Sequence, residues 1–208
     1  MKYAVRKKVL LIDFDGVIVD TFDLCMETSN KVWGHHSVDK YREWFEGNLY
    51  KSLNIDQDGF TDKENIFFKL YAPRMLKLDP IEGIIDIMGR LRERHVLVII
   101  STSVNSPIEE YLAKHSMTSN FDKVFGADIH KSKVMKIKMV FDEYGVTPQD
   151  CLFITDTLGD MREAREAGVD AIGVTWGWHP RETLEKGFPF TIVDKPSEIM
   201  EAVDRYFS

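Results

Sequence analysis

Four short segments of this chain are apolar from end to end, and they constrain its fold more than any other feature. A strand that faces water on one side alternates apolar and polar residues, whereas a continuous apolar run is typical of a strand covered on both faces. Stretches with the apolar spacing of amphipathic helices separate the four segments. This order predicts an α/β fold, a doubly wound parallel sheet (Rossmann-like core) with helices on both faces. The segments are Val9–Ile12, Val96–Ile100, Cys151–Ile154 and Ala171–Val174.

Capping residues predict where several of the helices begin and end. Asp79 precedes Pro80 and is followed by a further acid, which predicts a helix with Asp79 as its N-cap. Ser106 stands before a proline and an acid in the same way and predicts a second helix start. Gly145 and Gly168 follow helical stretches and predict their C-terminal ends.

Residues 21–78 interrupt the alternation of strands and helices. They combine many aromatic and large apolar residues with helix-forming residues, and they hold few stretches typical of strands. We therefore expect a small all-helical cap inserted after the first strand. This predicts two domains, an α/β core of residues 1–20 and 79–208 and a helical cap domain of residues 21–78.

Composition narrows the class of partner. The chain has 208 residues, of which 44% are hydrophobic, enough for one sizeable core and a small appended domain. Its formal net charge is −7 and it has no long run of lysine and arginine, which argues against nucleic acid and anionic membranes as partners. The substrate can still be an anion, because a bound metal ion reverses the local field.

The N-terminal and cysteine patterns indicate a compartment. The apolar run near the N-terminus is only a few residues long before two acids, too short for a signal peptide or a membrane span. Cys25 and Cys151 lack the neighbours of a zinc site or a disulfide framework. We expect a cytoplasmic protein.

Two pairs of acids follow two of the apolar segments. Asp13 and Asp15 come directly after the first, while Asp156 and Asp160 follow the third. If these strands are neighbours, the four carboxylates converge at the edge of the sheet where such folds bind ligands. Like charges in one cleft need a cation or protons to compensate them. Oxygen ligands of this kind suit Mg²⁺.

A structural interpretation of these acids competes with the metal site. A lone aspartate at a strand end is more often a turn residue or a helix cap, and Asp156 and Asp160 alone are compatible with that role. Two separate pairs, each directly after an apolar strand, are harder to explain as caps. The pattern therefore favours a metal site.

Ser101 and two lysines are candidates for binding an anion. Ser101 follows the second apolar segment, either as part of a polar loop or as a hydroxyl that hydrogen-bonds a phosphoryl oxygen. Lys131 and Lys133 precede a helical stretch, either as solvated residues or as phosphate ligands. Cations are disfavoured at a helix N-terminus, so a lysine there is consistent with a bound phosphate.

Taken together, these residues resemble the haloacid dehalogenase superfamily of phosphohydrolases over nearly the whole chain, with the helical insertion in the place of that family's cap. Gly173–Gly177 resembles the phosphoglycolate phosphatase-like branch. One departure is Thr155, where these phosphatases usually have glycine. The motifs that carry the resemblance are Asp13–Asp20, Ile99–Ser101, a lysine at 131 or 133, and Asp156–Asp160.

The resemblance implies roles for the acids. Asp13 would attack phosphorus and form an aspartyl-phosphate, and Asp15 would protonate the leaving oxygen and then activate water. Mg²⁺ would be held by Asp13, the carbonyl oxygen of Asp15 and Asp156, with Asp160 close by. No other cofactor is implied. Phosphoryl transfer needs mostly positioning and charge neutralisation, in agreement with these roles.

The resemblance also implies that Ser101 and one lysine hold the phosphoryl group. Many relatives have Lys-Pro at this lysine; because no proline follows Lys131, Lys133 is favoured narrowly over Lys131. Asp15 argues against dehalogenation, because dehalogenases of the superfamily lack an acid at this position.

The predicted function is thus Mg²⁺-dependent hydrolysis of a phosphate monoester of a small metabolite. A phosphosugar mutase of the same family is an alternative that would return the phosphate to the sugar. A non-catalytic receiver-like phosphate-binding module is an alternative of another class, although it needs neither Asp15 as a proton donor nor a cap. The chain is expected to be a monomer or a homodimer.

Overall fold

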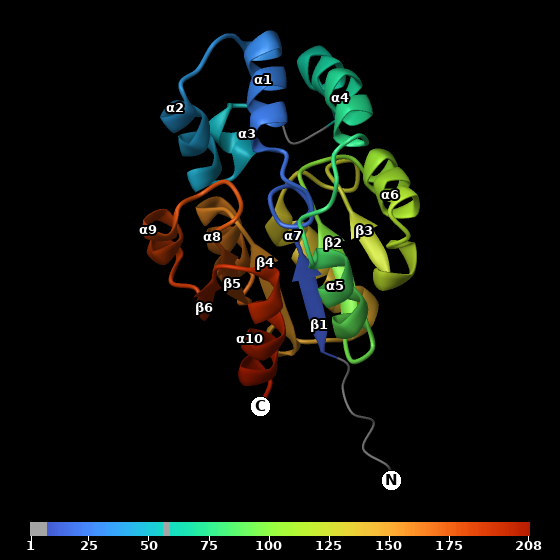
Figure 1. Cartoon of the computed structure of the whole chain (residues 1–208). Helices are drawn as coiled ribbons and strands as arrows, with labels where there is room; N and C mark the ends of the chain where they lie inside the picture. Colours follow the sequence, from blue (N-terminus) through green and yellow to red (C-terminus); the bar gives the residue numbers. More distant parts are fainter. Residues whose placement is uncertain (1–7, 56–58) are drawn as a thin grey trace.

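A single six-stranded parallel sheet forms the centre of the protein. The computed structural model describes residues 8–55 and 59–208, and within them the strands lie in the order β3-β2-β1-β4-β5-β6 (Figure 1). The strands are β1 (Val9–Ile12), β2 (Val96–Ile100), β3 (Lys123–Phe125), β4 (Cys151–Thr155), β5 (Asp170–Val174) and β6 (Thr191–Val193). The predicted parallel sheet is confirmed, and each of the four apolar segments forms a strand.

The register of the sheet brings the acidic motifs together. Val9 of β1 pairs with Val96 of β2 on one side and with Cys151 of β4 on the other. Strands β1 and β4 are therefore neighbours that end at the same level, so Asp13 and Asp156 emerge at one edge. This is the arrangement on which the predicted metal site depended.

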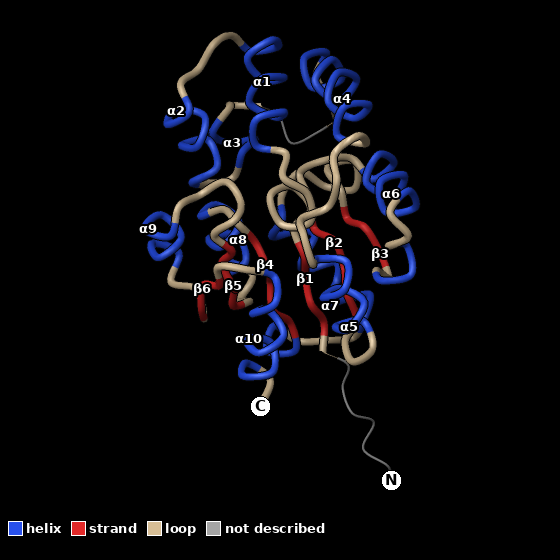
Figure 2. Tube along the Cα trace, viewed as in Figure 1, coloured by secondary structure: helices blue, strands red, loops and turns tan. Residues whose placement is uncertain are grey.

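Helices cover both faces of the sheet, so the fold is doubly wound (Figure 2). Alternate residues of β1 face opposite ways: Leu10 and Ile12 lie in one buried cluster with α5, α6 and α10, whereas Val9 and Leu11 lie in another with α7, α8 and α9. These helices are α5 (Ile84–Arg92), α6 (Asn105–Lys114), α7 (Lys133–Tyr144), α8 (Leu158–Glu166), α9 (Arg181–Leu184) and α10 (Ile199–Tyr206). Short 3-10 helices connect several elements, at Trp44–Glu46, Thr118–Asn120, Pro148–Asp150, Glu185–Gly187 and Pro196–Glu198.

The helical insertion lies over the carboxyl ends of the strands (Figure 1). It contains α1 (Phe22–Trp33), α2 (Val38–Glu43), α3 (Leu49–Ser52) and α4 (Asp62–Met75). Trp33 and Phe67 pack with ring centroids 5.6 Å apart, joining α1 to α4. Thr61 and Glu64 form a reciprocal capping box that fixes the start of α4. The insertion after the first strand is confirmed as helical; its division from the core at residues 20 and 79 stays a prediction.

The prediction that Asp79 caps a helix is wrong. Helix α5 begins later, with Gly83 as its N-cap. Pro80 instead forms an antiparallel bridge with Val19, and the Ile81 N–H donates to the Ile18 carbonyl oxygen at 2.9 Å. These contacts tie the segment leaving the insertion to the segment that enters it, and this pairing overrides the local capping signal.

The other predicted helix ends differ by little. Helix α6 begins at Asn105, so Ser106 lies inside its first turn. Gly145 ends α7 in the left-handed conformation, with φ of 62°, and Gly168 follows α8 with φ of 82°. Both glycine predictions are confirmed.

Candidate active site

Asp13 is held rigidly at the end of β1. Its side chain is buried, and its N–H continues the sheet by donating to the Ile154 carbonyl oxygen at 3.0 Å. The Phe14 N–H donates to its Oδ1 at 2.8 Å. Its Oδ2 accepts from the Lys133 Nζ at 2.8 Å. The backbone therefore fixes one carboxylate oxygen of Asp13 while the other meets a cation.

Two glycines make room for the carboxylate of Asp156. Gly16 has φ of 77°, and a Cβ added to Gly16 or to Gly177 would overlap the Asp156 side chain. The Trp178 N–H donates to Asp156 Oδ2 at 2.7 Å. The other oxygen, Oδ1, is buried and accepts no hydrogen bond from the described residues. A buried carboxylate oxygen without a donor is unfavourable unless a cation binds it.

Asp160 joins the two strand-end acids from the first turn of α8. Its Oδ2 accepts from Lys133 Nζ at 2.8 Å and from the Thr155 hydroxyl at 2.9 Å. Thr155 is thus compatible with the site, and its hydroxyl supports an acid where relatives usually carry glycine.

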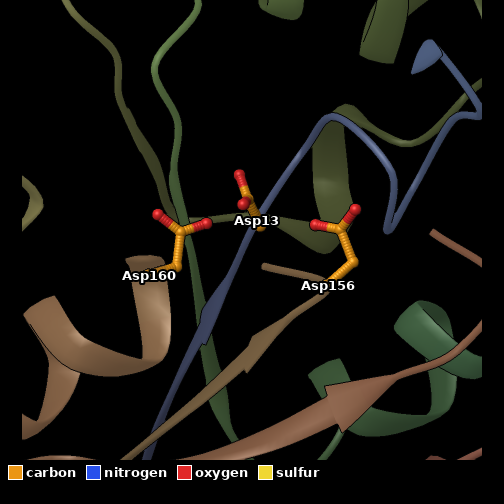
Figure 3. A group of neighbouring side chains, drawn as sticks. All are labelled: Asp13, Asp156 and Asp160. Atoms are coloured by element: carbon orange, nitrogen blue, oxygen red, sulfur yellow. The ribbon is translucent and has the colours of Figure 1, made fainter. Parts of the chain in front are cut away.

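The three acids Asp13, Asp156 and Asp160 form one cluster (Figure 3). Each offers an oxygen within 4.8 Å of the others, and all three are buried. Two follow neighbouring strands and the third comes from α8, so the parallel register assembles them. Their number, spacing and oxygen chemistry fit a divalent metal ion.

Burial and neighbouring charges shift the pKa values of the three acids in different directions. Burial raises the pKa of Asp13 well above its usual range, against the opposing effect of Lys133, and it raises the pKa of Asp156 to about 8. Burial acts in the same direction on Asp160, but Lys133 and neighbouring hydrogen bonds lower its pKa to about 2. One lysine therefore does not balance the three acids, which supports the fit of a cation.

Lys133, rather than Lys131, lies at the acidic cluster. It is the first residue of α7, is 1% exposed, and has its Nζ 2.8 Å from oxygens of both Asp13 and Asp160. Burial alone would lower the pKa of Lys133, but these two acids outweigh that effect and raise it, so the ammonium stays charged. Lys131 instead pairs with Glu64 of α4 at 2.8 Å.

Ser101 lies directly behind the site. It is fully buried, its Oγ accepts the Ser103 N–H at 2.9 Å, and its carbonyl oxygen accepts from Lys136. The neighbouring Thr102, not Ser101, lines the cavities described below. Ser101 thus shapes the loop after β2, and its hydroxyl is set back from the open space.

Asp15 faces the insertion rather than the acidic cluster. Among the described residues, three hydroxyl groups donate to its carboxylate: Thr21 at 2.9 Å, Ser103 at 2.8 Å, and Tyr71 of α4. Asp13 and Asp15 therefore have different partners although one residue separates them. Tyr71 could not be predicted from the sequence, because it lies in the insertion, far from any motif.

Glu163 is a second residue that sequence reasoning missed. Its Oε1 accepts the N–H of Lys133 at 3.0 Å and the amide of Asn48, from the insertion, at 3.0 Å. A buried acid at the N-terminus of α7 complements the helix dipole and offsets the lysine placed there. The available signal was its position three residues after Asp160, on the same face of α8.

Two cavities meet at Asp15. The first, which we call the polar cavity, is bordered by Asp13, Lys133, Asp160 and Glu163 among others. The second, which we call the cap cavity, lies between the insertion and the core and has a volume of about 60 Å³. Asp15, Thr102 and Trp178 border both. The site thus divides into an ionic part and a part enclosed by the insertion.

The loop after β5 connects the core to the insertion beside the site. Trp178 packs against the ring of Phe45, with centroids 4.6 Å apart. Nδ1 of His179 accepts the Leu158 N–H at 3.0 Å, so its Nε2 is the donor to the Arg42 carbonyl oxygen at 3.0 Å. His179 therefore joins the core to the insertion through the main chain.

No helix in the described ranges combines the length and apolar character needed to cross a membrane.

Comparison with known proteins agrees with this architecture. A phosphoglycolate phosphatase from Synechococcus elongatus is 25% identical over 206 residues, covering 94% of this chain and 97% of the relative. An N-acetylmuramic acid 6-phosphate phosphatase from Pseudomonas aeruginosa is 23% identical and covers 96% of each chain. A solved haloacid dehalogenase-like hydrolase from Streptococcus pneumoniae has the same fold, with a TM-score of 0.78 at 22% identity, covering 99% of this chain and 100% of that one.

The family described as haloacid dehalogenase-like hydrolase matches residues 10–174, which include Asp13, Asp156 and Asp160. This match confirms the resemblance inferred from the motifs. The chain belongs to the haloacid dehalogenase-like hydrolases.

Proposed function

We propose that this protein is a Mg²⁺-dependent phosphatase that hydrolyses a small phosphate monoester through an aspartyl-phosphate on Asp13. The observation that carries the proposal is the placement of Asp13, backbone-fixed beside Lys133, with Asp15 two residues further on at the junction of the two cavities. The named relatives, which are phosphatases, support the same reaction class.

Asp13, Asp156 and the carbonyl oxygen of Asp15 would hold the Mg²⁺, with Asp160 close by. When bound, the ion neutralises charge on the phosphoryl group and the cluster. The donor-free Oδ1 of Asp156 and the excess of acids over lysine support this assignment.

The chain's own residues divide the reaction into two steps. In the first, a carboxylate oxygen of Asp13 forms a bond to phosphorus as the ester oxygen leaves, and Asp15 gives that oxygen a proton. In the second, Asp15 takes a proton from water, whose oxygen attacks phosphorus and releases phosphate and Asp13. Lys133 and Ser101 would hold the phosphoryl oxygens. Because Ser101 is buried, we expect Lys133 to contribute more to binding.

The test is phosphate release from 4-nitrophenyl phosphate. The Asp13→Asn variant should lose at least about 1,000-fold in kcat, as expected when a nucleophile is removed. Chelation of divalent ions should abolish activity, and added Mg²⁺ should restore it. The exposed Asp142, on α7, provides a matched control, and Asp142→Asn should retain activity. Full activity in Asp13→Asn, or under chelation, would contradict the mechanism.

Phosphate release also separates this proposal from a mutase, which returns the phosphate to its sugar. With 4-nitrophenyl phosphate, whose leaving group needs no proton, Asp15→Asn should leave a phosphorylated enzyme that turns over slowly, detectable as one added phosphoryl group by mass spectrometry. The assembly state, monomer or homodimer, and the cytoplasmic location stay predictions.

A further inference from the structure

The position of Asp15 separates the two halves of a substrate. If Asp15 protonates the leaving oxygen, the phosphoryl group lies on the side of Asp13 and Lys133, in the polar cavity. The alcohol must then lie on the other side of Asp15, in the cap cavity. The chemistry of the cap cavity therefore selects the alcohol.

Aromatic side chains dominate the lining of the cap cavity. Of its 17 lining residues, eight are aromatic and three are aliphatic (Leu49, Leu53 and Ile55). Several of the rings pack on one another, as Phe67 and Phe68 do with centroids 5.4 Å apart. Such a wall favours apolar surface.

The charged residues of the lining also indicate that the cavity does not favour an anionic group. Its charged residues within the described part of the chain are two acids, Asp15 and Glu64, and no lysine or arginine is among them. Lys131 lies beyond the lining, paired with Glu64 at 2.8 Å and 4.9 Å from the centroid of the Tyr50 ring. A carboxylate placed in this cavity would meet apolar rings and no cation of the described lining, so its burial would be costly.

We propose that the cap cavity binds a compact, uncharged, apolar alcohol, so that the preferred substrates are phosphate monoesters with a short branched hydrocarbon next to the ester oxygen. This inference rests on the proposed phosphatase function. The preferred substrate would then differ from that of relatives named for phosphoglycolate, because the alcohol part of phosphoglycolate carries a carboxylate. The cavity of about 60 Å³ is several times the space that one water needs but smaller than the roughly 150 Å³ that holds benzene. A branched chain suits it best, and a ring requires the insertion to shift.

Two esters of the same shape isolate the charge. Isobutyl phosphate and phosphoglycolate both place a planar or branched group one carbon from the ester oxygen, but only phosphoglycolate carries a carboxylate there. We expect kcat/KM for isobutyl phosphate to exceed that for phosphoglycolate by at least about tenfold, the scale of discrimination that one mismatched group produces in a closed pocket. Benzyl phosphate tests the upper size limit, and we expect it to be hydrolysed more slowly than isobutyl phosphate.

A charge placed in the lining should reverse the preference. Leu53→Lys introduces a cation into the cap cavity and should raise the ratio of phosphoglycolate to isobutyl phosphate turnover about tenfold. Ile66, on α4, is 50% exposed and does not line the cavity, so Ile66→Lys is the matched control and should leave the ratio unchanged. If Leu53→Lys fails to fold, the comparison of isobutyl phosphate with phosphoglycolate in the wild type still tests the inference.

The outcomes separate this inference from the proposed function. If the wild type releases phosphate from 4-nitrophenyl phosphate and Asp13→Asn does not, the phosphatase function holds. Equal turnover of the two matched esters, or a preference for phosphoglycolate, would then overturn the inference alone. If no ester releases phosphate, the proposed function fails and the inference with it.

Discussion

At the scale of single residues, Asp13 and Asp15 differ in their surroundings although only Phe14 separates them. Asp13 shares Lys133 with Asp160, whereas Asp15 accepts hydrogen bonds from three hydroxyl groups. Different surroundings would allow the two carboxylates to take the roles proposed for them, one as a nucleophile and one as an acid and base.

Tyr71 gives this difference a test. Its hydroxyl donates to Asp15 from α4, so Tyr71→Phe should leave Asp15 less well oriented. We expect kcat for alkyl phosphates, which need a proton on the leaving oxygen, to fall about tenfold. The loss for 4-nitrophenyl phosphate should be smaller, because nitrophenolate leaves without one.

The control for this variant is Tyr206→Phe, which removes a hydroxyl that donates to Asp170 at 3.0 Å on an exposed surface. Its kinetics should match the wild type for both kinds of ester. An equal loss for good and poor leaving groups in Tyr71→Phe would show that Tyr71 acts on folding or binding rather than through Asp15.

The residue scale also shows where the sequence stopped being informative. The acids could be placed because each follows a strand that its own composition predicts. The sequence favoured Lys133 over Lys131 only narrowly, because two positions separate the lysines and only their partners, Asp13 and Glu64, distinguish them clearly. Tyr71 reaches Asp15 across 56 residues of sequence, and no local pattern encodes such a contact.

At the scale of elements, the turn after β1 determines whether the acidic cluster can form. Gly16 has φ of 77° and lies against the Asp156 carboxylate. Gly16→Ala should lower the free energy of unfolding by more than about 1 kcal/mol, because alanine is strained at this φ and its Cβ would displace Asp156. Urea denaturation measures this loss, and the affinity for Mg²⁺ by calorimetry should fall with it.

Gly89 is the matched control. It lies inside α5 with no heavy atom within 4 Å of an added Cβ. Gly89→Ala should therefore stabilise the protein by about 0.5–1 kcal/mol, because alanine favours the helix. A Gly16→Ala variant as stable as the wild type would contradict the close packing described for Asp156.

Element prediction succeeded where composition alone decides the structure. The four apolar segments form strands, because a short continuous apolar run suits a strand covered on both faces. Strands β3 and β6, which have three residues each and lie at the two edges of the sheet, were not predicted. The N-cap expected at Asp79 was wrong because Pro80 pairs with Val19, a contact between distant segments.

At the scale of the whole molecule, the insertion is held to the core by buried polar contacts. Lys131 and Glu64 are 2% and 4% exposed and pair across the boundary. Asn48 donates to Glu163 at 3.0 Å, and the Arg42 Nε donates to the Trp178 carbonyl oxygen at 2.8 Å. Together with the aromatic packing around Trp178 and the hydrogen bonds of Tyr71 and His179, these contacts hold the insertion over Asp15.

Glu64→Gln tests this attachment. Removing one partner of a buried ion pair weakens the compensation of the other charge, which costs up to about 3–5 kcal/mol. We expect the insertion to open so that water reaches the Lys131 ammonium. The amide hydrogens of α4 should then exchange faster. Adding Lys131→Met should restore part of the protection. Glu43→Gln, in the exposed pair with Lys40, should change the stability by less than about 1 kcal/mol. Unchanged exchange in Glu64→Gln would rule out a role for this pair in attachment.

The bridge between Val19 and Pro80 has a consequence for how such a chain can change. Because the two ends of the insertion touch, the residues between them form one closed loop attached to the sheet at a single place, whatever its length or sequence. We expect segments of other lengths to be accepted between Val19 and Pro80 without moving β1 or β2. The strand-end acids Asp13 and Asp156 would then stay in place while the insertion changes, and grafting a foreign insertion at these two residues should yield a folded core.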